Sequence, residues 1–297
     1  MSDGALSPRR EAFANIRLSR RRDIPFLRRI YRLSFGDGLA SENLLFRELY
    51  REDNCYVFTR FGLPAAMAFA LPATIRSCGR EWRGLYLYAV ATHPRRRRKG
   101  YSSRLLEWIH ADAAARGLDF ALLVPASPDL YEFYARLGYE KVGRICRYDY
   151  MPPPPTAAAG VPLRLTPVSG ELYGRARELL LRDSSYLVWQ SELLAYQSKM
   201  LALFGGGFCL LQEGGRDIGC AAVSRHSGGL EVQEILVPPE WLQSALTALA
   251  GHYGVQRLRA RLPVERGLAL GLRGLDLAMV YAPQAAWREL YVALVMD

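Results

Sequence analysis

The sequence predicts an α/β protein built from two tandem halves of similar plan. Two observations support this. Short apolar, β-branched segments alternate with segments of helical periodicity along the whole chain. A proline run at 152–155 divides the chain, and the order of predicted elements before it recurs, in weaker form, after it.

In the first half, a helix over 24–34 begins at Asp23, a plausible N-cap, with Pro25 in its first turn. The helix over 99–116 carries Leu105, Ile109 and Ala113 on one face, at i, i+4 and i+8, and Gly117 is placed to end it. The remaining expected elements are a helix at 41–51, a hairpin of strands 55–60 and 65–75 that turns at Gly62, a helix at 128–137, and strands at 14–19, 83–92, 120–124 and 139–150.

The second half is expected to repeat this order. Asp183, Ser184 and Ser185 are interpreted as a helix end. The expected elements are strands at 163–167, 208–213, 219–226, 230–237, 256–262 and 287–296, and helices at 171–182, 189–204 and 239–253.

The proline run sets the predicted domain boundary. Consecutive prolines lack amide donors and have a fixed φ, so they favour an extended spacer over a packed element. A chain of 297 residues is also comfortable for two domains. We therefore predict domains at 1–151 and 161–297, joined by a Pro/Ala-rich linker at 152–160.

The composition narrows the class of protein. No run of about 18 apolar residues exists, and residues 1–15 lack the apolar stretch of a secretory signal, so we expect a short disordered leader and a cytoplasmic protein. The five cysteines form no Cys-x-x-Cys pair, and the histidines are isolated, so we expect reduced thiols and no metal site. The net charge of +10 suits either nucleic acid or an anionic cofactor.

The segment 85–106 carries the chemistry. It is a strand, then a basic loop with Gly100, then an amphipathic helix. Unpaired amides and the helix dipole make such a helix N-terminus an anion site, well suited to pyrophosphate. Gly100 and the small Ser102 and Ser103 allow a phosphate to approach the backbone, and the basic residues at 95–99 add positive charge.

These residues resemble a known family. Arg97-x-x-Gly100-x-Ser102 is similar to the Arg/Gln-x-x-Gly-x-Gly/Ala motif of the GNAT N-acetyltransferases, with Ser102 as a departure. Leu130 to Tyr139 resembles the family's second motif, Phe-Tyr-x-x-x-Gly-Phe/Tyr. The tandem layout is most similar to the enhanced intracellular survival acetyltransferases, without their sterol-carrier-like domain. The resemblance implies two GNAT-like domains, each a mixed, mostly antiparallel sheet flanked by helices.

The resemblance also implies a transfer of acetyl from acetyl-CoA to an amine, with roles for particular residues. Val90 and Thr92 would hold the pantetheine arm through main-chain groups. Tyr134 would protonate the departing thiolate, although a purely structural tyrosine with its hydroxyl bonded to the backbone is the alternative. The pyrophosphate would be surrounded by Arg97, Arg98, Gly100, Ser102 and Ser103.

The general base stays open at this stage. Glu132, the strand face with Tyr86 and Tyr88, and a water chain are alternatives, and Tyr131 and Tyr88 are interpreted as pocket wall. His93 is expected to shape the loop. In the intracellular-survival relatives the terminal carboxylate takes part, which leaves the role of Asp297 open.

The second half lacks the motif: Pro238-Pro-Glu240 follows its strand, with no Arg-x-x-Gly. We expect a degenerate, non-catalytic domain that shapes the acceptor pocket or an interface. Three functions compete: acyl transfer to an amine on a small molecule, peptide or protein; a CoA-binding sensor or scaffold without turnover; and a nucleic-acid module, which lacks any helix-turn-helix or stacking pattern. We expect no nucleic-acid or membrane partner. The acyl-chain preference and the oligomeric state, a homo-oligomer included, are open.

Overall fold

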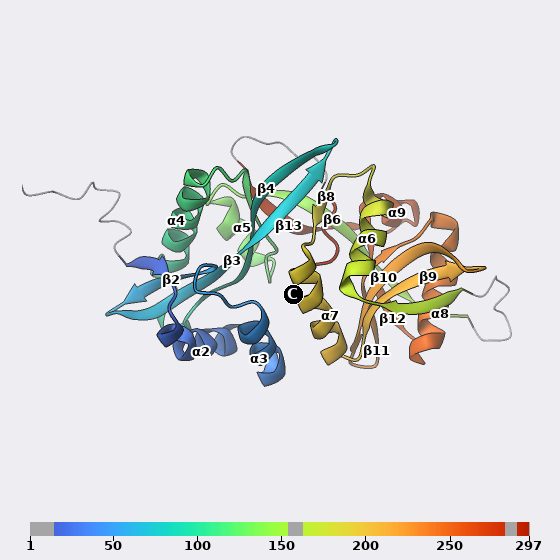
Figure 1. Cartoon of the computed structure of the whole chain (residues 1–297), viewed down its shortest axis with the longest axis horizontal. Coiled ribbons are helices and arrows are strands. Elements are labelled where there is room, and N and C mark those ends of the chain that lie inside the picture. Colours follow the sequence, from blue (N-terminus) through green and yellow to red (C-terminus); the bar gives the residue numbers. More distant parts are fainter. Residues whose placement is uncertain (1–14, 154–162, 283–289, 297) are drawn as a thin grey trace, which may run out of the picture.

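The structure is a computed structural model that describes residues 15–153, 163–282 and 290–296. It has a mixed α/β fold, in which one large, open and mostly antiparallel sheet is flanked by helices, so the predicted fold class is confirmed. Two halves of similar plan lie side by side (Figure 1). Parallel pairing occurs at two places in the described sheet, between β4 and β5 and between β11 and β12.

The elements of the first half follow the predicted order. Helix α2 begins after Asp23 and ends at Gly36, whose φ of +72° provides the left-handed cap. The elements are β1 (Ile16–Leu18), η1 (Arg21–Asp23), α2 (Ile24–Phe35), α3 (Gly38–Glu48), β2 (Cys55–Arg60), β3 (Leu63–Ser77), β4 (Arg80–Thr92), η2 (Pro94–Arg96), α4 (Tyr101–Ala115), β5 (Phe120–Leu123), α5 (Asp129–Ala135) and β6 (Glu140–Tyr150).

The second half repeats much of that order. Ser169 caps its first helix by accepting a hydrogen bond from the Leu172 amide. The elements are β7 (Arg164–Val168), α6 (Gly170–Leu181), β8 (Tyr186–Val188), α7 (Ser191–Leu203), β9 (Gly207–Glu213), β10 (Arg216–His226), β11 (Gly229–Leu236), η4 (Pro239–Trp241), α8 (Leu242–Tyr253), β12 (Leu258–Pro263), α9 (Val264–Ala269) and β13 (Gly274–Tyr281).

The two halves exchange a strand at the centre of the sheet. The strand order is β1-β2-β3-β4-β5-β13-β6-β12-β11-β10-β9-β7. Strand β13, from the end of the chain, therefore lies between β5 and β6 of the first half, and β6 pairs in turn with β12 of the second half. Figure 1 shows β13 beside the elements of the first half. The pair β13–β6 lies at the centre of the sheet. Outward from it, β5, β4, β3, β2 and β1 on one side correspond in order to β12, β11, β10, β9 and β7 on the other.

Three sequence predictions need correction. The last strand lies at Gly274–Tyr281 and not at 287–296; the described part of that range, 290–296, forms no regular strand, and residues 283–289 lie outside the described residues. Helix α3 begins and ends three residues earlier than expected, where Asn54 accepts from the Arg51 amide and donates to the Leu49 carbonyl beyond its end. Strand β8 was not predicted; it follows the helix end at Asp183–Ser185 and pairs with β3.

The segment Leu290–Met296 packs between the halves as irregular but buried chain. Its residues bond to both sides: the Leu290 amide donates to Val142 of β6, and the Tyr291 amide donates to Ser185. The Gln197 amide of α7 donates to the Val295 carbonyl at 3.0 Å. Most of the predicted linker lies outside the described residues, as does the predicted leader, so the division at 152–160 stays a prediction.

Candidate active site

Strands β4 and β5 of the first half are paired over only part of their length. They pair in parallel over Gly84–Tyr86 and Phe120–Leu122. Beyond that point the described residues show no pairing between them. On its other edge β4 carries a bulge, because Tyr88 pairs with Phe69 whereas Ala91 pairs with Met67. Ala89 accordingly has a positive φ of 50°. Val90 and Thr92, two predicted site residues, lie on this stretch of β4, beyond its last pairing with β5.

Helix α4 begins with uncapped amides next to the end of β4. Gly100 precedes its first turn with a φ of +72°, and no side chain caps the helix. Arg98 also has a positive φ, of 62°. Successive amides in such a turn converge and form an anion-binding concavity at the helix N-terminus. Ser102 and Ser103 lie in the first turn and are half-buried, whereas Arg97 and Arg98 are exposed.

The predicted cofactor residues are brought together by direct contacts. The hydroxyls of Thr92 and Ser102 lie 2.6 Å apart, and the Arg97 guanidinium donates to the Thr92 carbonyl at 3.3 Å. The end of β4 is thus tied to the loop and to the first turn of α4. The His93 ring nitrogen accepts from the Arg95 amide at 3.3 Å, so His93 shapes the η2 turn. Burial and the nearby arginines lower the pKa of His93.

Tyr134 lies in the core on the α4 side of the sheet, in one apolar cluster with Leu87 of β4 and Leu123 of β5. Its ring packs edge-on against Tyr139, with centroids 5.6 Å apart. Burial raises the pKa of Tyr134 to about 12. Its hydroxyl has no hydrogen-bond partner among the described residues, so the backbone bond required by the structural alternative is absent there. The side chain is therefore a protonated phenol with a free donor at neutral pH.

Behind Tyr134, the exchanged strand completes the core. Tyr281 of β13 stacks on His110 of α4, with ring centroids 4.0 Å apart, and His110 bonds the Tyr139 hydroxyl at 2.8 Å. Burial lowers the pKa of His110 to about 4, so its ring is neutral near pH 7. Tyr131, on the same helix as Tyr134, donates to the Asp276 carbonyl at 2.7 Å. Sequence reasoning missed both contacts, because it did not place β13 here.

The opposite face of β4 carries a cluster of tyrosines. Tyr88 is half-buried there, and its side chain lies within hydrogen-bonding reach of Tyr31 of α2. The Tyr31 hydroxyl donates to the exposed carboxylate of Asp37 at 2.5 Å. Tyr196 of α7 approaches the same place from the second half, and its charge raises the pKa of Tyr31. Burial, first of all, raises the pKa of Tyr31, Tyr88 and Tyr196.

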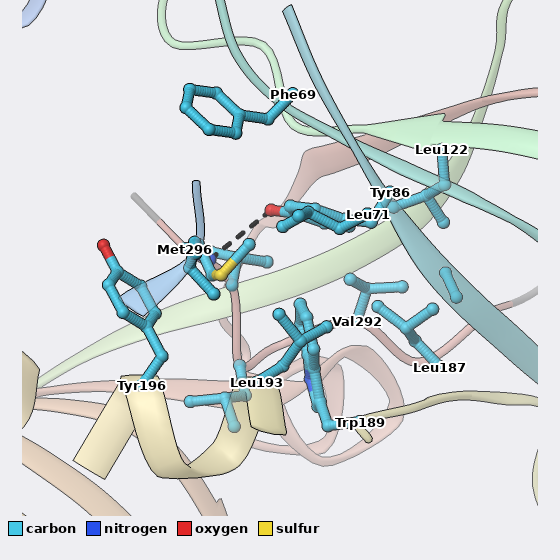
Figure 2. Close-up of a cluster of buried hydrophobic side chains, with 14 of the residues drawn as sticks. Phe69, Leu71, Tyr86, Leu122, Leu187, Trp189, Leu193, Tyr196, Val292 and Met296 are labelled. Carbon is cyan, nitrogen blue, oxygen red and sulfur yellow. Dashed lines mark hydrogen bonds between the residues drawn. The ribbon is translucent and has the colours of Figure 1, made fainter. Parts of the chain in front are cut away.

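The C-terminal segment meets this face at Tyr86. The Met296 amide donates to the Tyr86 hydroxyl at 3.4 Å. Figure 2 shows Met296 against Tyr86, with Trp189, Leu193 and Tyr196 of the second half around it. Trp189 packs edge-on against Tyr86 at 5.2 Å. Asp297 lies outside the described residues. Glu132, another predicted base, is exposed on α5 with no hydrogen bond among the described residues.

The second half has the same strand plan without the loop. In the first half four residues, 97–100, separate η2 from α4, whereas α8 follows η4 directly. At the strand bulge that corresponds to Ala89, Glu234 is fully buried and pairs with Arg177 of α6 at 2.8 Å. Tyr173 also donates to Glu234. No phosphate-binding turn is therefore present at this end of β11.

Comparison with known proteins agrees with this geometry. Residues 15–142 match the family model described as an acetyltransferase (GNAT) domain. This part of the chain is a GNAT acetyltransferase domain. The match spans β1 to β6 and includes both sequence motifs. A search of curated proteins found no match.

Solved structures are similar over most of the chain. A GCN5-related N-acetyltransferase from Anabaena variabilis superposes with a TM-score of 0.73 at 17% identity, covering 89% of this chain and 71% of that one. Eis1 from Mycobacterium abscessus gives 0.63 at 14% identity, covering 90% and 72%. A putative acetyltransferase from Pyrococcus horikoshii gives 0.60 at 15% identity and covers 94% of both chains. At such low identities, it is the TM-scores and the coverage that show a shared fold, and this fold extends through both halves. Among the described residues, no helix has the length and apolar character to span a bilayer.

Proposed function

We propose that this protein transfers an acetyl group from acetyl-CoA to an amine. The observation that supports this most is the joint presence of two features. One is the uncapped, glycine-initiated helix α4, whose first turn contacts the end of β4; the other is the buried Tyr134, which packs with residues of β4 and β5. The family match supports acyl transfer in general. The amine acceptor would be a small molecule, a peptide or a protein side chain.

Two features of the first half would bind acetyl-CoA: the start of α4 and the stretch of β4 beyond its pairing with β5. The amides at the start of α4, with Gly100, Ser102 and Ser103, would accept the pyrophosphate, and Arg97 and Arg98 would add positive charge. The stretch of β4 with Val90 and Thr92 is not paired with β5 among the described residues, so the pantetheine amides would add to β4 there as a further strand does. The Arg97 bond to the Thr92 carbonyl would fix the position of the pyrophosphate site at α4 relative to the pantetheine site along β4.

The reaction would proceed by direct attack. The acceptor amine forms a bond to the thioester carbonyl carbon, the carbon–sulfur bond breaks, and the thiolate takes the proton of the Tyr134 hydroxyl. A phenol suits this role because it is protonated at neutral pH and burial holds it so. The amine must lose a proton before attack. Tyr88, Tyr31 and Asp37 would conduct that proton from the acceptor face of β4 to solvent.

The test compares two tyrosines of the same helix. Tyr134→Phe keeps the ring and removes the proton donor, so kcat should fall by about 10²–10⁴-fold with the Kd for acetyl-CoA nearly unchanged. Tyr131→Phe removes a hydroxyl that donates to the Asp276 carbonyl. This variant should therefore lower the melting temperature but leave kcat nearly unchanged. Thiol release with an amine library gives the rates. Equal rates in the two variants would reject the role of Tyr134. Tight acetyl-CoA binding without turnover for any amine would favour the sensor or scaffold instead.

A further inference from the structure

A cavity lies between the halves, away from the residues predicted to bind acetyl-CoA. Its volume is about 540 Å³, within the range of small-molecule sites. The walls come from the C-terminal end of α6, the ends of β11 and β12, the start of α9, strand β6 and the C-terminal segment. None of the residues predicted to hold acetyl-CoA or to act on it lines this cavity.

The cavity occupies the second half's counterpart of the β4–β5 opening. Strands β11 and β12 pair in parallel over Leu230–Val232 and Leu258–Ala260, and the described residues show no pairing between them beyond that. The residues that follow the separation, 236–238 on β11 and 263–266 after β12, line the cavity. The fold thus opens the second half at the same place as the first, but without a phosphate loop.

The lining combines apolar walls with an unpartnered cation. Leu181, Leu236 and Leu290 are buried and form part of the wall. The Arg266 guanidinium has a buried Nη1 atom with no hydrogen-bond partner in the described part of the chain, and no carboxylate there lies within 4.0 Å of it. The residue as a whole is half-buried. Burying part of a guanidinium without an acceptor is costly, and burial lowers the pKa of Arg266 accordingly.

The other charged groups at the cavity form no ion pair with Arg266. Arg144 also lines it, and its guanidinium is 3.9 Å from the Asp276 carboxylate. Asp183 also lines the cavity, but its side chain is 90% exposed and lies 3.4 Å from Arg182. Glu265 is exposed and acts on Arg266 only through its charge. Arg266 lines the cavity and has no carboxylate in direct contact among the described residues, and the more exposed atoms of its half-buried side chain would meet an acceptor that enters.

We propose that this cavity binds a small organic carboxylate with an apolar body, with its carboxylate on Arg266 and its body against the leucines. A charge-assisted bond to a half-buried guanidinium supplies the affinity, and the apolar wall supplies the selection for a hydrocarbon chain. The absence of the loop that corresponds to 97–100 excludes a second coenzyme A at this place. The ligand is thus distinct in class from the proposed acetyl donor.

The test uses three six-carbon probes of different charge. Calorimetry is carried out on the full-length protein, with coenzyme A added to saturate its proposed site at α4. It should show that one hexanoate binds per chain. Hexan-1-ol and hexylamine should bind at least about tenfold more weakly. Arg266→Gln should weaken hexanoate binding by at least about tenfold, whereas Arg273→Gln, at an exposed arginine nearby, should not.

A second variant tests whether hexanoate binds inside the cavity itself. Val264→Phe should fill the cavity and abolish hexanoate binding while the melting temperature and coenzyme A affinity stay near those of the wild type. Hexanoate that binds no better than hexan-1-ol, or equally well to either variant, would overturn the proposal. A protein that fails to bind coenzyme A but binds hexanoate through Arg266 would reject the proposed function and leave this site standing.

Discussion

Two glycines lie at the ends of helix α4 with nearly the same backbone geometry. Gly100 has a φ of +72° and Gly117 a φ of +68°, and a Cβ at either position would meet open space. A substitution at either one therefore costs the same kind of backbone strain, about 1–2 kcal/mol. They differ in what the helix end attracts, since the N-terminus favours anions and the C-terminus does not.

This pair gives a matched test of the phosphate site. Gly100→Glu and Gly117→Glu should lower the melting temperature by similar amounts. Only Gly100→Glu places a carboxylate where pyrophosphate would bind, so only it should weaken acetyl-CoA binding, by at least about tenfold. Calorimetry on both variants measures this. If the two variants bound acetyl-CoA with similar affinity, the pyrophosphate would not bind at this loop.

The pKa of Tyr134 sets an expected pH dependence. A phenol in water titrates near ~10, and burial raises the pKa of Tyr134 to about 12. Because the raised pKa keeps the neutral, proton-donating form to higher pH, kcat should not fall between about pH 8 and about pH 10. Below that range, protonation of the acceptor amine should lower the rate. An alkaline limb with an apparent pKa near ~10 would contradict a buried acid.

Much of the site could be predicted from the sequence because its parts are local. The helix start at Gly100 and the strand before it depend on neighbouring residues, so Thr92, Arg97 and Ser102 were expected together and do contact one another. The roles of these residues in binding stay predictions. Tyr31, Asp37 and Tyr196 were not foreseen, because only tertiary packing brings α2 and α7 to the face of β4.

At the scale of elements, a buried ion pair joins α6 to β11. Arg177 and Glu234 are almost fully buried and 2.8 Å apart, and Arg177 also donates to the Leu187 carbonyl. Arg177→Met leaves Glu234 as an uncompensated buried charge and should lower the free energy of unfolding by about 3–5 kcal/mol. Urea denaturation measures it.

Two further variants check that the effect comes from the pair. Arg175→Met removes an exposed ion pair with Glu171 on the same helix and should change stability little. The double variant Arg177→Met/Glu234→Met removes both charges and should recover part of the loss. A double variant less stable than Arg177→Met alone would show that the pair is not the main cause.

The sequence could not predict the exchanged strand. The pattern at 274–281 mixes exposed and buried residues, and only Ala278, Met279 and Val280 are fully buried. The segment 290–296 is more continuously apolar, which favoured a strand there. Its burial has another cause, because it packs between the halves and pairs with the sheet only through a single bridge between Tyr291 and Tyr186 of β8 in the described residues. Strand choice in this region therefore depends on a partner more than 120 residues away in sequence.

At the scale of the whole molecule, the exchange ties the halves together. Strand β5 pairs with β13, with Met279 opposite Leu123, and β6 pairs with β12, with Leu262 opposite Cys146. Removing residues 161–297 would leave β5 and β6 without the strand between them and would expose apolar edges. Such edges promote aggregation. The prediction that the second half is a separate domain does not imply that the first half folds alone.

Cutting the chain between 152 and 160 tests this without removing any strand. A protease site introduced there should give two fragments that stay together in size-exclusion chromatography, because the exchanged strands hold them. The nicked protein should keep acetyl-CoA affinity and turnover near those of the intact chain. Residues 1–151 expressed alone should be insoluble or fail to bind acetyl-CoA, and co-expression with 161–297 should restore binding. A soluble 1–151 fragment with full activity would mean that β13 is dispensable for the site, and that the exchange connects the halves without supporting the chemistry.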